Sequence, residues 1–253
     1  ALASQSADYK SQEIRVIDVS TGKAKTVFHQ VDDRWAEVSD IGWDRESKKI
    51  WFTSDQSGFK HLYTAGIDGN GLKQITHGNW EIHNDSFSHD PQWIGDSIYY
   101  SSTAAGTAER QLYRVKADGS SLPERLSKQE GMHIGWISED GRSRAELRAD
   151  MKNPFDLYVD DARVTKSPRA EFYQVPWADA RFVTYPSTKD HKPVAARLLL
   201  PPGYDSDRPA AKAWPAIVYI HGAGYATSVL KQWGSYQELR FVFNNFLAQH
   251  GYV

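Results

Sequence analysis

The stretch PAIVYIHGAGYATS, residues 215–228, has the residue types and spacing that could do chemistry. An apolar run leads straight into a loop of histidine, small residues and tyrosine. Glycine lets backbone N–H groups approach a ligand closely. Donors aimed at a reacting carbonyl oxygen are each worth roughly 10²–10³ in rate. The loop therefore predicts a pocket for the oxyanion of acyl transfer, with His221 and Gly222 as candidate donors and Tyr225 as the alternative.

Such a pocket serves a nucleophile, and the sequence has no nucleophile motif to accompany it. A serine on a strand-to-helix elbow carries the pattern G-x-S-x-G, which the chain lacks. The nearest imitation, residues 141–145, has no final glycine and no apolar strand before it. Cysteine is absent, which excludes cysteine nucleophiles, disulfides and thiolate metal sites. The sequence therefore predicts only half of an active site, without the nucleophile that it would serve.

Other candidate ligands fit ordinary packing better. His77, His83 and His89 recur every six residues but lack the compact spacing of metal ligands. No metal and no cofactor is therefore expected. A set of tryptophans recurs with the repeats described next and is expected in the core: Trp43, Trp51, Trp93 and Trp136.

Internal repetition predicts the elements of the first part of the chain. Residues 96–127 repeat the pattern of residues 49–78, and weaker copies begin near Glu13 and Gly135. Each copy has short apolar strands separated by turns such as Asp-Gly. Units of roughly 40–50 residues with four strands are typical of β-propeller blades. About three to three and a half blades are expected, fewer than a closed propeller has.

The sequence pattern changes near residue 168, within a proline-containing connector. The segment 180–205 predicts a hairpin, and the apolar run 216–220 predicts a central strand covered on both sides. Apolar residues from 239 to 247 recur at helical spacing and predict a helix that ends at Gly251. Strand, helix and the start of another strand predict a βαβ crossover cut off at its second strand.

Composition excludes several classes of protein. Thirty basic and 32 acidic residues leave a formal net charge of −2, without a long run of one sign. The positive footprint of a nucleic-acid-binding protein is therefore missing. No run of about 18 apolar residues occurs, so no membrane span is expected. The densest basic stretch, Arg142 to Lys152, includes Glu146 and Asp150 and is expected on a solvated blade edge.

The sequence resembles the dipeptidyl peptidase IV branch of the prolyl oligopeptidase family. TSDQSGFKHLYTAGIDGNGLKQITHGNWEI (residues 53–82) and ERQLYRVKADG (residues 109–119) look like its later propeller blades. ARLLLPPGYD followed by PAIVYIHGAGYATS is similar to the opening of its α/β-hydrolase domain. The resemblance implies a mixed fold: later blades of a β-propeller over residues 1–167, then a truncated α/β-hydrolase domain over 168–253, cut before the nucleophile elbow.

The resemblance also implies a function. The parent protein is expected to be a serine peptidase that removes dipeptides with Pro or Ala second, while this chain alone, without the triad, is inactive. A tyrosine of this loop donates to the oxyanion in that branch, whereas the aligned position here is His221. Trp35 in DDRWAEV lies where related enzymes bring blade residues near the substrate, so it is a candidate for substrate binding. A homodimer and a periplasmic or secreted location fit the same family.

Two alternatives stay open. One is another peptidase of the family, an oligopeptidase or an acylaminoacyl-releasing enzyme, since no paired glutamates that would hold a free amino terminus occur here. The other is a non-catalytic propeller protein that binds a partner through its blades.

Overall fold

The computed structural model describes residues 1–253 except 38–39, 83–89, 206–212, 221, 223–226 and 235–240. The chain divides into two compact units. The first contains Ala1–Leu147 and Leu157–Val164, and the second contains Arg148–Asp156 and Thr165–Val253.

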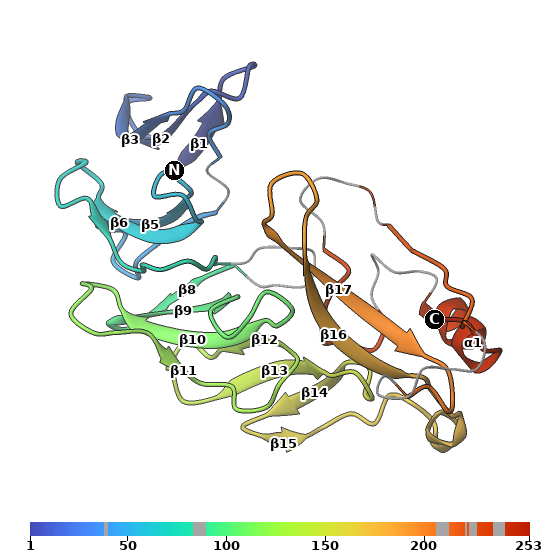
Figure 1. Cartoon of the computed structure of the whole chain (residues 1–253). Helices are drawn as coiled ribbons and strands as arrows, with labels where there is room; N and C mark the ends of the chain where they lie inside the picture. The colour runs from blue at the N-terminus through green and yellow to red at the C-terminus, as the bar shows by residue number, and fades with distance from the viewer. Residues whose placement is uncertain (38–39, 83–89, 206–212, 221, 223–226, 235–240) are drawn as a thin grey trace. The chain divides into compact units, whose positions relative to one another are not determined.

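The blade prediction is confirmed: within the described residues the region up to 163 forms one three-stranded and three four-stranded sheets (Figure 1). In every sheet the strands that follow one another in sequence are neighbours, as in the blades of a propeller. The strands are β1 (Leu2–Gln5), β2 (Ser11–Ile17), β3 (Ala24–Val31), β4 (Ile41–Trp43), β5 (Lys49–Ser54), β6 (His61–Gly66), β7 (Lys73–Gln74), β8 (Gln92–Ile94), β9 (Ser97–Ser102), β10 (Gln111–Lys116), β11 (Glu124–Arg125), β12 (Met132–Ile137), β13 (Arg144–Ala149), β14 (Asp156–Val159) and β15 (Ala162–Arg163).

The sequence repeat has a register counterpart in the two central sheets. Trp43 lies opposite Ile50 across β4 and β5, and Trp93 lies opposite Ile98 across β8 and β9. The turn after β6 and the turn after β10 also match, because Gly69 and Gly119 both have positive φ angles, 78° and 67°. Only glycine adopts that conformation without steric cost, which explains why Asp-Gly recurs there.

The same set of buried hydrogen bonds, called the polar lock below, recurs in the sheets β4–β7 and β8–β11. In each sheet it lies at the start of the third strand. In the first, the Thr76 hydroxyl accepts the Leu62 N–H at 3.0 Å and lies 3.1 Å from His61 Nδ1, while His61 Nε2 lies 2.9 Å from the Gly78 carbonyl. A carbonyl only accepts, so Nε2 carries the hydrogen and Nδ1 accepts from the hydroxyl. Burial lowers the pKa of His61, which keeps the ring neutral as this arrangement requires.

The second sheet makes the same lock with an amide in place of the imidazole. Gln111 Oε1 accepts the Ser127 hydroxyl at 2.5 Å, and Gln111 Nε2 donates to the Gln129 carbonyl at 3.0 Å. The Ser127 oxygen accepts the Leu112 N–H at 3.0 Å. Two different side chains therefore satisfy the same buried backbone groups in successive blades.

The core of the first unit contains residues of both central sheets. One cluster unites Trp51 and Leu62 with Ile98, Tyr100 and other buried residues, and Trp93 packs against it. The expectation for Trp51 is thus confirmed, and that for Trp43 is wrong, because its side chain is 38% exposed. Trp43 is the last residue of the three-residue strand β4, where cover from neighbouring elements ends.

The longer segment of the second unit contains a short 3₁₀ helix, η1 (Ala170–Gln174), and a hairpin of β16 (Asp179–Pro186) and β17 (Pro193–Leu200). The hairpin prediction is confirmed, since the two strands pair antiparallel from Asp179 with Leu200 to Pro186 with Pro193. An aromatic cluster lies beside it, in which the Trp233 ring packs edge-on against Phe172, Trp177 and Phe241 at centroid distances of 4.8 to 5.2 Å.

The predicted helix is present as α1 (Phe241–Gln249), followed by Gly251 at a φ of 86°. Its buried face differs from the predicted apolar stripe, of which Leu239 lies outside the described residues. Phe241, Asn245 and Ala248 are buried, while Phe243 and Phe246 are more than half exposed. The Asn245 amide explains this orientation, because its Oδ1 accepts the Ala178 N–H at 2.9 Å. Within the described residues, no helix is long and apolar enough to cross a membrane.

The predicted central strand over residues 216–220 is wrong for the structure as described. These residues form no assigned strand, and their large side chains are exposed, Val218 by 81%. Two backbone bonds nevertheless show the start of parallel pairing: Ile217 N–H donates to the Val253 carbonyl at 2.8 Å, and Val253 N–H donates to the Pro215 carbonyl at 2.9 Å. Two hydrogen bonds are too few to define a strand. A single neighbouring residue also leaves the side chains of residues 216–220 uncovered.

Candidate functional site

The oxyanion loop begins directly after this parallel pairing. Of its three predicted donors, His221 and Tyr225 lie outside the described residues, so their roles stay predictions. Gly222 is described: it is exposed, and a methyl group on its Cα would meet no atom within 4 Å. The space beside its Cα is thus open, and the role of its N–H as an oxyanion donor stays a prediction.

Trp35, the predicted substrate contact, lies in the first unit and is 37% exposed. Its indole stacks on the phenol ring of Tyr9, with the ring centroids 4.4 Å apart and the planes inclined by 7°. Its backbone N–H donates to the carboxylate of Asp32 at 3.1 Å. The sequence pointed to the tryptophan but gave no signal for Tyr9, which lies far from it in the chain.

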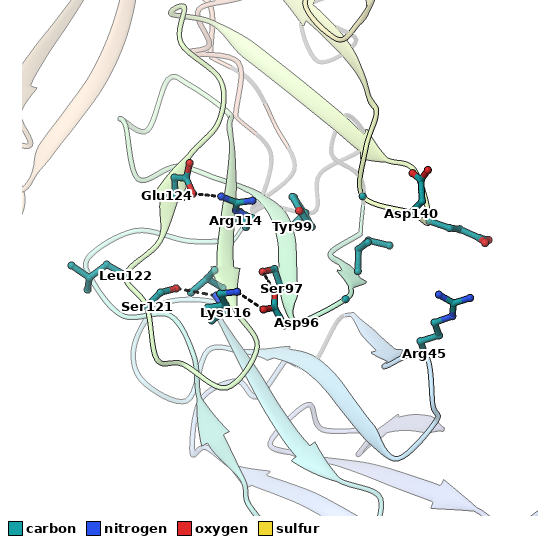
Figure 2. Close-up of a pocket in the computed structure, with 15 residues that line it drawn as sticks. Arg45, Asp96, Ser97, Tyr99, Arg114, Lys116, Ser121, Leu122, Glu124 and Asp140 are labelled. Carbon is teal, nitrogen blue, oxygen red and sulfur yellow. Dashed lines mark hydrogen bonds and ion pairs between the residues drawn. The ribbon is translucent and has the colours of Figure 1, made fainter.

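A cavity of about 480 Å³ opens over the sheet β8–β11 in the first unit (Figure 2). Its floor includes Arg114 and Lys116 of β10, and turns of three successive sheets contribute Arg45, Asp96 and Asp140 to its lining. Arg114 bonds Glu124 at 2.5 Å, and Lys116 pairs with Asp96. Both pairs are partly solvated, and water screens their attraction, so they contribute little to stability.

The lining of this cavity lacks a nucleophile with a base. The Ser97 hydroxyl donates to Asp96 at 2.7 Å, but hydrogen bonds from Lys116 and Ser97 lower the pKa of Asp96 and make it a poor proton acceptor. The Ser121 hydroxyl oxygen is occupied by the Lys116 N–H at 3.0 Å. The cavity can bind polar groups, but its lining has no arrangement for acyl transfer.

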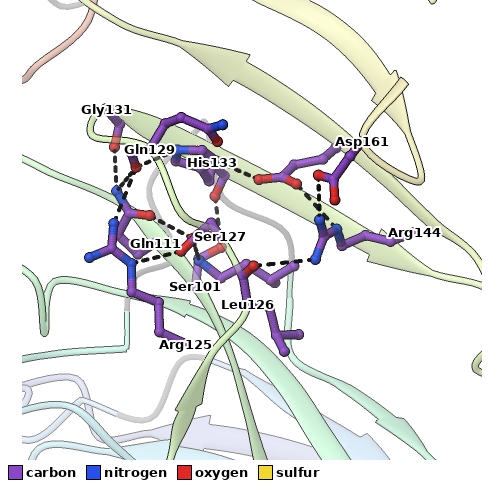
Figure 3. Close-up of polar contacts among 12 residues, drawn as sticks. Ser101, Gln111, Arg125, Leu126, Ser127, Gln129, Gly131, His133, Arg144 and Asp161 are labelled. Atoms are coloured by element: carbon purple, nitrogen blue, oxygen red, sulfur yellow. Dashed lines mark hydrogen bonds and ion pairs between the residues drawn. The ribbon is translucent and has the colours of Figure 1, made fainter. Parts of the chain in front are cut away.

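A buried charged network crosses β12 and β13 (Figure 3). The ring of His133 bonds the Glu146 carboxylate through Nδ1 and lies 3.0 Å from the Gln129 carbonyl through Nε2. The Arg144 guanidinium lies 3.2 Å from the other Glu146 oxygen and bonds Asp161 at 2.8 Å. Glu146 is fully buried, and the Arg144 guanidinium together with the hydrogen bond to the His133 ring compensates its desolvation.

This network corrects the prediction of a solvated edge for residues 142–152. Glu146 is buried in β13, where the His133 ring and the Arg144 guanidinium contact its carboxylate. The Ser101 hydroxyl donates to the backbone carbonyl of His133 at 3.3 Å. Both ring nitrogens of His133 are engaged by Glu146 and the Gln129 carbonyl instead, so the role of the network is structural. Metal ligation also finds no support: among the described residues no three His, Asp or Glu side chains could hold a metal ion, and His83 and His89 lie outside them.

A family profile described as "Dipeptidyl peptidase IV (DPP IV) N-terminal region" matches residues 2–153. The crystal structure of Porphyromonas gingivalis dipeptidyl peptidase 4 superimposes with a TM-score of 0.78 at 15% identity, and the match covers 99% of this chain and 35% of that one. At this identity the structural likeness concerns the fold alone.

Curated relatives from fungi agree with the profile. An Aspergillus fumigatus protein named "Probable dipeptidyl peptidase 4" is 31% identical over 111 residues, which are 41% of this chain and 14% of the relative. An Aspergillus flavus protein of the same name is 24% identical over 250 residues, 88% of this chain and 30% of the relative. The matched region thus spans less than a third of either relative.

Successive four-stranded sheets with a shared core and a matching register define the first unit as part of a β-propeller. The profile match extends over more than half of the chain. The chain belongs to the dipeptidyl peptidase IV N-terminal region family.

Proposed function

We propose that this chain is the later propeller and the first part of the catalytic domain of a serine peptidase that removes dipeptides from the amino end of peptides, with Pro or Ala second. The observation that carries the proposal is the family match over residues 2–153, joined to relatives named for dipeptidyl peptidase activity. The proposed boundaries are 1–167 for the blades and 168–253 for the start of the α/β-hydrolase domain. The resemblance further suggests a homodimer and a periplasmic or secreted location.

In the proposed mechanism, a serine of the intact protein attacks the peptide carbonyl, and the loop after residue 220 stabilises the oxyanion. The loop sequence HGAG supports this role, because its glycines let backbone N–H groups approach a ligand closely. The side-chain donor is His221 or Tyr225, and only one of them needs to reach the oxygen. Blades over the catalytic domain would restrict substrates by size.

Hydrolysis of a fluorogenic Gly-Pro substrate tests the proposal. The intact protein should turn it over and be labelled by a fluorophosphonate, whereas this chain alone should do neither because it lacks G-x-S-x-G. In the intact protein, loss of the oxyanion donor should lower kcat by roughly 10²–10³, so H221A and Y225F distinguish the two candidates. An intact protein that contains no reactive serine would overturn the proposal in favour of a binding module.

A substrate series separates the remaining peptidase alternative. Substrates with a free amino terminus should react, and matched amino-acetylated substrates should not. The reverse preference would indicate an oligopeptidase or an acylaminoacyl-releasing enzyme.

A further inference from the structure

The sequence contains a single Asn-Gly pair, Asn70-Gly71, which lies in the turn between β6 and β7. The backbone nitrogen of a residue can attack the side-chain amide of an asparagine directly before it, because both groups belong to one chain and a small ring closes. A bulky side chain on the second residue hinders this approach, whereas glycine has none. The pair therefore has the composition for a covalent change within the chain, and the geometry of the turn decides whether it occurs.

The Gly71 nitrogen is available for this attack. Within the part of the chain that the structure describes, its N–H donates to no acceptor. Asn70 and Gly71 are both exposed, and a methyl group on the Gly71 Cα would meet no atom within 4 Å. Most backbone N–H groups in a folded chain are engaged in hydrogen bonds that would have to break first, and here none has to break.

The Asp-Gly pairs of the chain, which could undergo the corresponding reaction, lack this availability. They are Asp68-Gly69, Asp118-Gly119 and Asp140-Gly141. In each pair the glycine N–H donates to the carbonyl three residues earlier, at 2.8 or 2.9 Å. A hydrogen bond from a residue two positions away also lowers the pKa of each aspartate, so the carboxyl group stays ionised and is a poor electrophile.

The Asn70 side chain is held within the turn by Asp68. Asn70 Nδ2 donates to the Asp68 carboxylate at 2.7 Å, and the Asn70 N–H donates to the same carboxylate at 3.0 Å. The amide nitrogen that contacts the carboxylate is the one that would have to leave. A negative charge beside it favours the positive charge that develops as this nitrogen takes up a proton.

We propose that Asn70 is a site of spontaneous deamidation in the folded protein. The Gly71 nitrogen forms a bond to Asn70 Cγ and gives up its proton, and the side-chain nitrogen leaves with that proton as ammonia. Water then opens the resulting succinimide ring at either carbonyl, which gives aspartate or isoaspartate at position 70. No catalytic residue takes part, so the reaction is independent of the proposed peptidase function.

Deamidation changes both the charge and the backbone of this turn. Either product places a second carboxylate beside Asp68. Isoaspartate also carries the main chain through the former side chain, so the backbone gains a carbon atom in a turn that the Gly66 N–H closes by donating to the Asn70 carbonyl at 2.8 Å.

Peptide mapping of the aged 253-residue chain tests the site. The folded protein is kept in mildly alkaline buffer, digested with trypsin and analysed by mass spectrometry beside an unaged sample. The peptide of residues 61–73, which trypsin releases after Lys60 and Lys73, should gain the mass that replacement of an amide by a carboxylic acid adds. Conversion should rise with pH, because the attacking nitrogen must lose its proton. N70S should show none, and serine suits the turn because Ser120 occupies the corresponding position in the next sheet.

Asn79 is the matched control within the same digest, because it is also exposed but is followed by Trp80. It should convert more slowly than Asn70 by roughly tenfold or more, since the indole hinders the attack. Absence of conversion at Asn70 in the folded chain, equal conversion at Asn79, or isomerisation at Asp118 as fast as deamidation at Asn70 would each overturn the proposal.

Discussion

His61 shows how one residue connects the blade repeat to the pH dependence of folding. Its neutral ring donates from Nε2 to Gly78 and accepts at Nδ1 from Thr76. Gln111 does the same with its amide, which has no titratable proton. Glutamine should therefore replace histidine in the first lock with its hydrogen bonds retained.

We predict that H61Q makes the free energy of unfolding less sensitive to acid. Burial lowers the pKa of His61 from its ordinary 6.5; the Gly78 carbonyl opposes this shift, and His77 adds to it. The unfolded chain then binds the proton first as the pH falls, so the stability from the neutral ring is complete above pH 6.5 and lost as the pH falls through the lower pKa of the folded state.

Urea unfolding between about pH 7.5 and about pH 5 measures this slope. The free energy of unfolding should fall less steeply for H61Q than for the unsubstituted chain. H29Q, at an exposed histidine, is the control and should keep the original slope. Identical slopes in all three proteins would contradict the prediction.

For single residues, the sequence predicts a role where two copies of the repeat can be compared. It does not predict a role that depends on a contact with a residue from another strand. The repeat of residues 49–78 in residues 96–127 predicts two equivalent blades, and the structure has His61 and Gln111 in equivalent hydrogen bonds. Glu146 gave no such signal, because a carboxylate among basic residues is usually solvated. Its burial depends on His133, which reaches it from the neighbouring strand.

Among the elements, the Asp-Gly turn after β6 needs a glycine because its backbone adopts a positive φ angle. Gly69 has a φ of 78°, and a methyl group there would meet only ordinary contacts, the nearest being Val27 Cα at 3.5 Å. G69A should therefore lower the free energy of unfolding by roughly 1–2 kcal/mol through backbone strain alone. G222A, in open space and without a positive φ, should change it by less than about 0.5 kcal/mol. Urea denaturation compares the two, and equal effects would refute the argument.

The two faces of α1 should respond differently to substitution. Phe246 is half exposed, so F246Q should alter the free energy of unfolding by less than about 0.5 kcal/mol. Ala248 is 1% exposed, and A248L should cost about 1–3 kcal/mol because the site has no room for a larger side chain. Thermal unfolding measures both. A large loss in F246Q would show that its ring is packed rather than solvated.

The helix also marks how far periodicity predicts an element. Apolar spacing located α1 correctly, but it did not identify the buried face, which the Asn245 side chain fixes by bonding the Ala178 backbone. The run 216–220 marks a second limit. Its apolar character describes a strand covered on both faces, whereas the described residues supply pairing only from Val253 at its start.

For the whole molecule, the repeat predicts that blades form, but it does not show how far the stability of one blade depends on the next. Each blade is a small sheet that cannot bury its own faces, so its stability depends on its neighbours. The cluster that joins Trp51, Leu62 and Ile75 to Ile98 and Tyr113 contains side chains of two successive sheets. A change in one of these sheets should therefore be felt in the other.

L62A tests this coupling. Leu62 is fully buried in the shared cluster, and its truncation should cost about 2–5 kcal/mol. Hydrogen exchange should show lost protection in β9 and β10 as well as in β5 and β6, because both pairs of strands border the new cavity. L122A, at a side chain that is 89% exposed, should leave protection unchanged. If L62A loosens β5 and β6 alone, the blades are energetically independent despite their shared core.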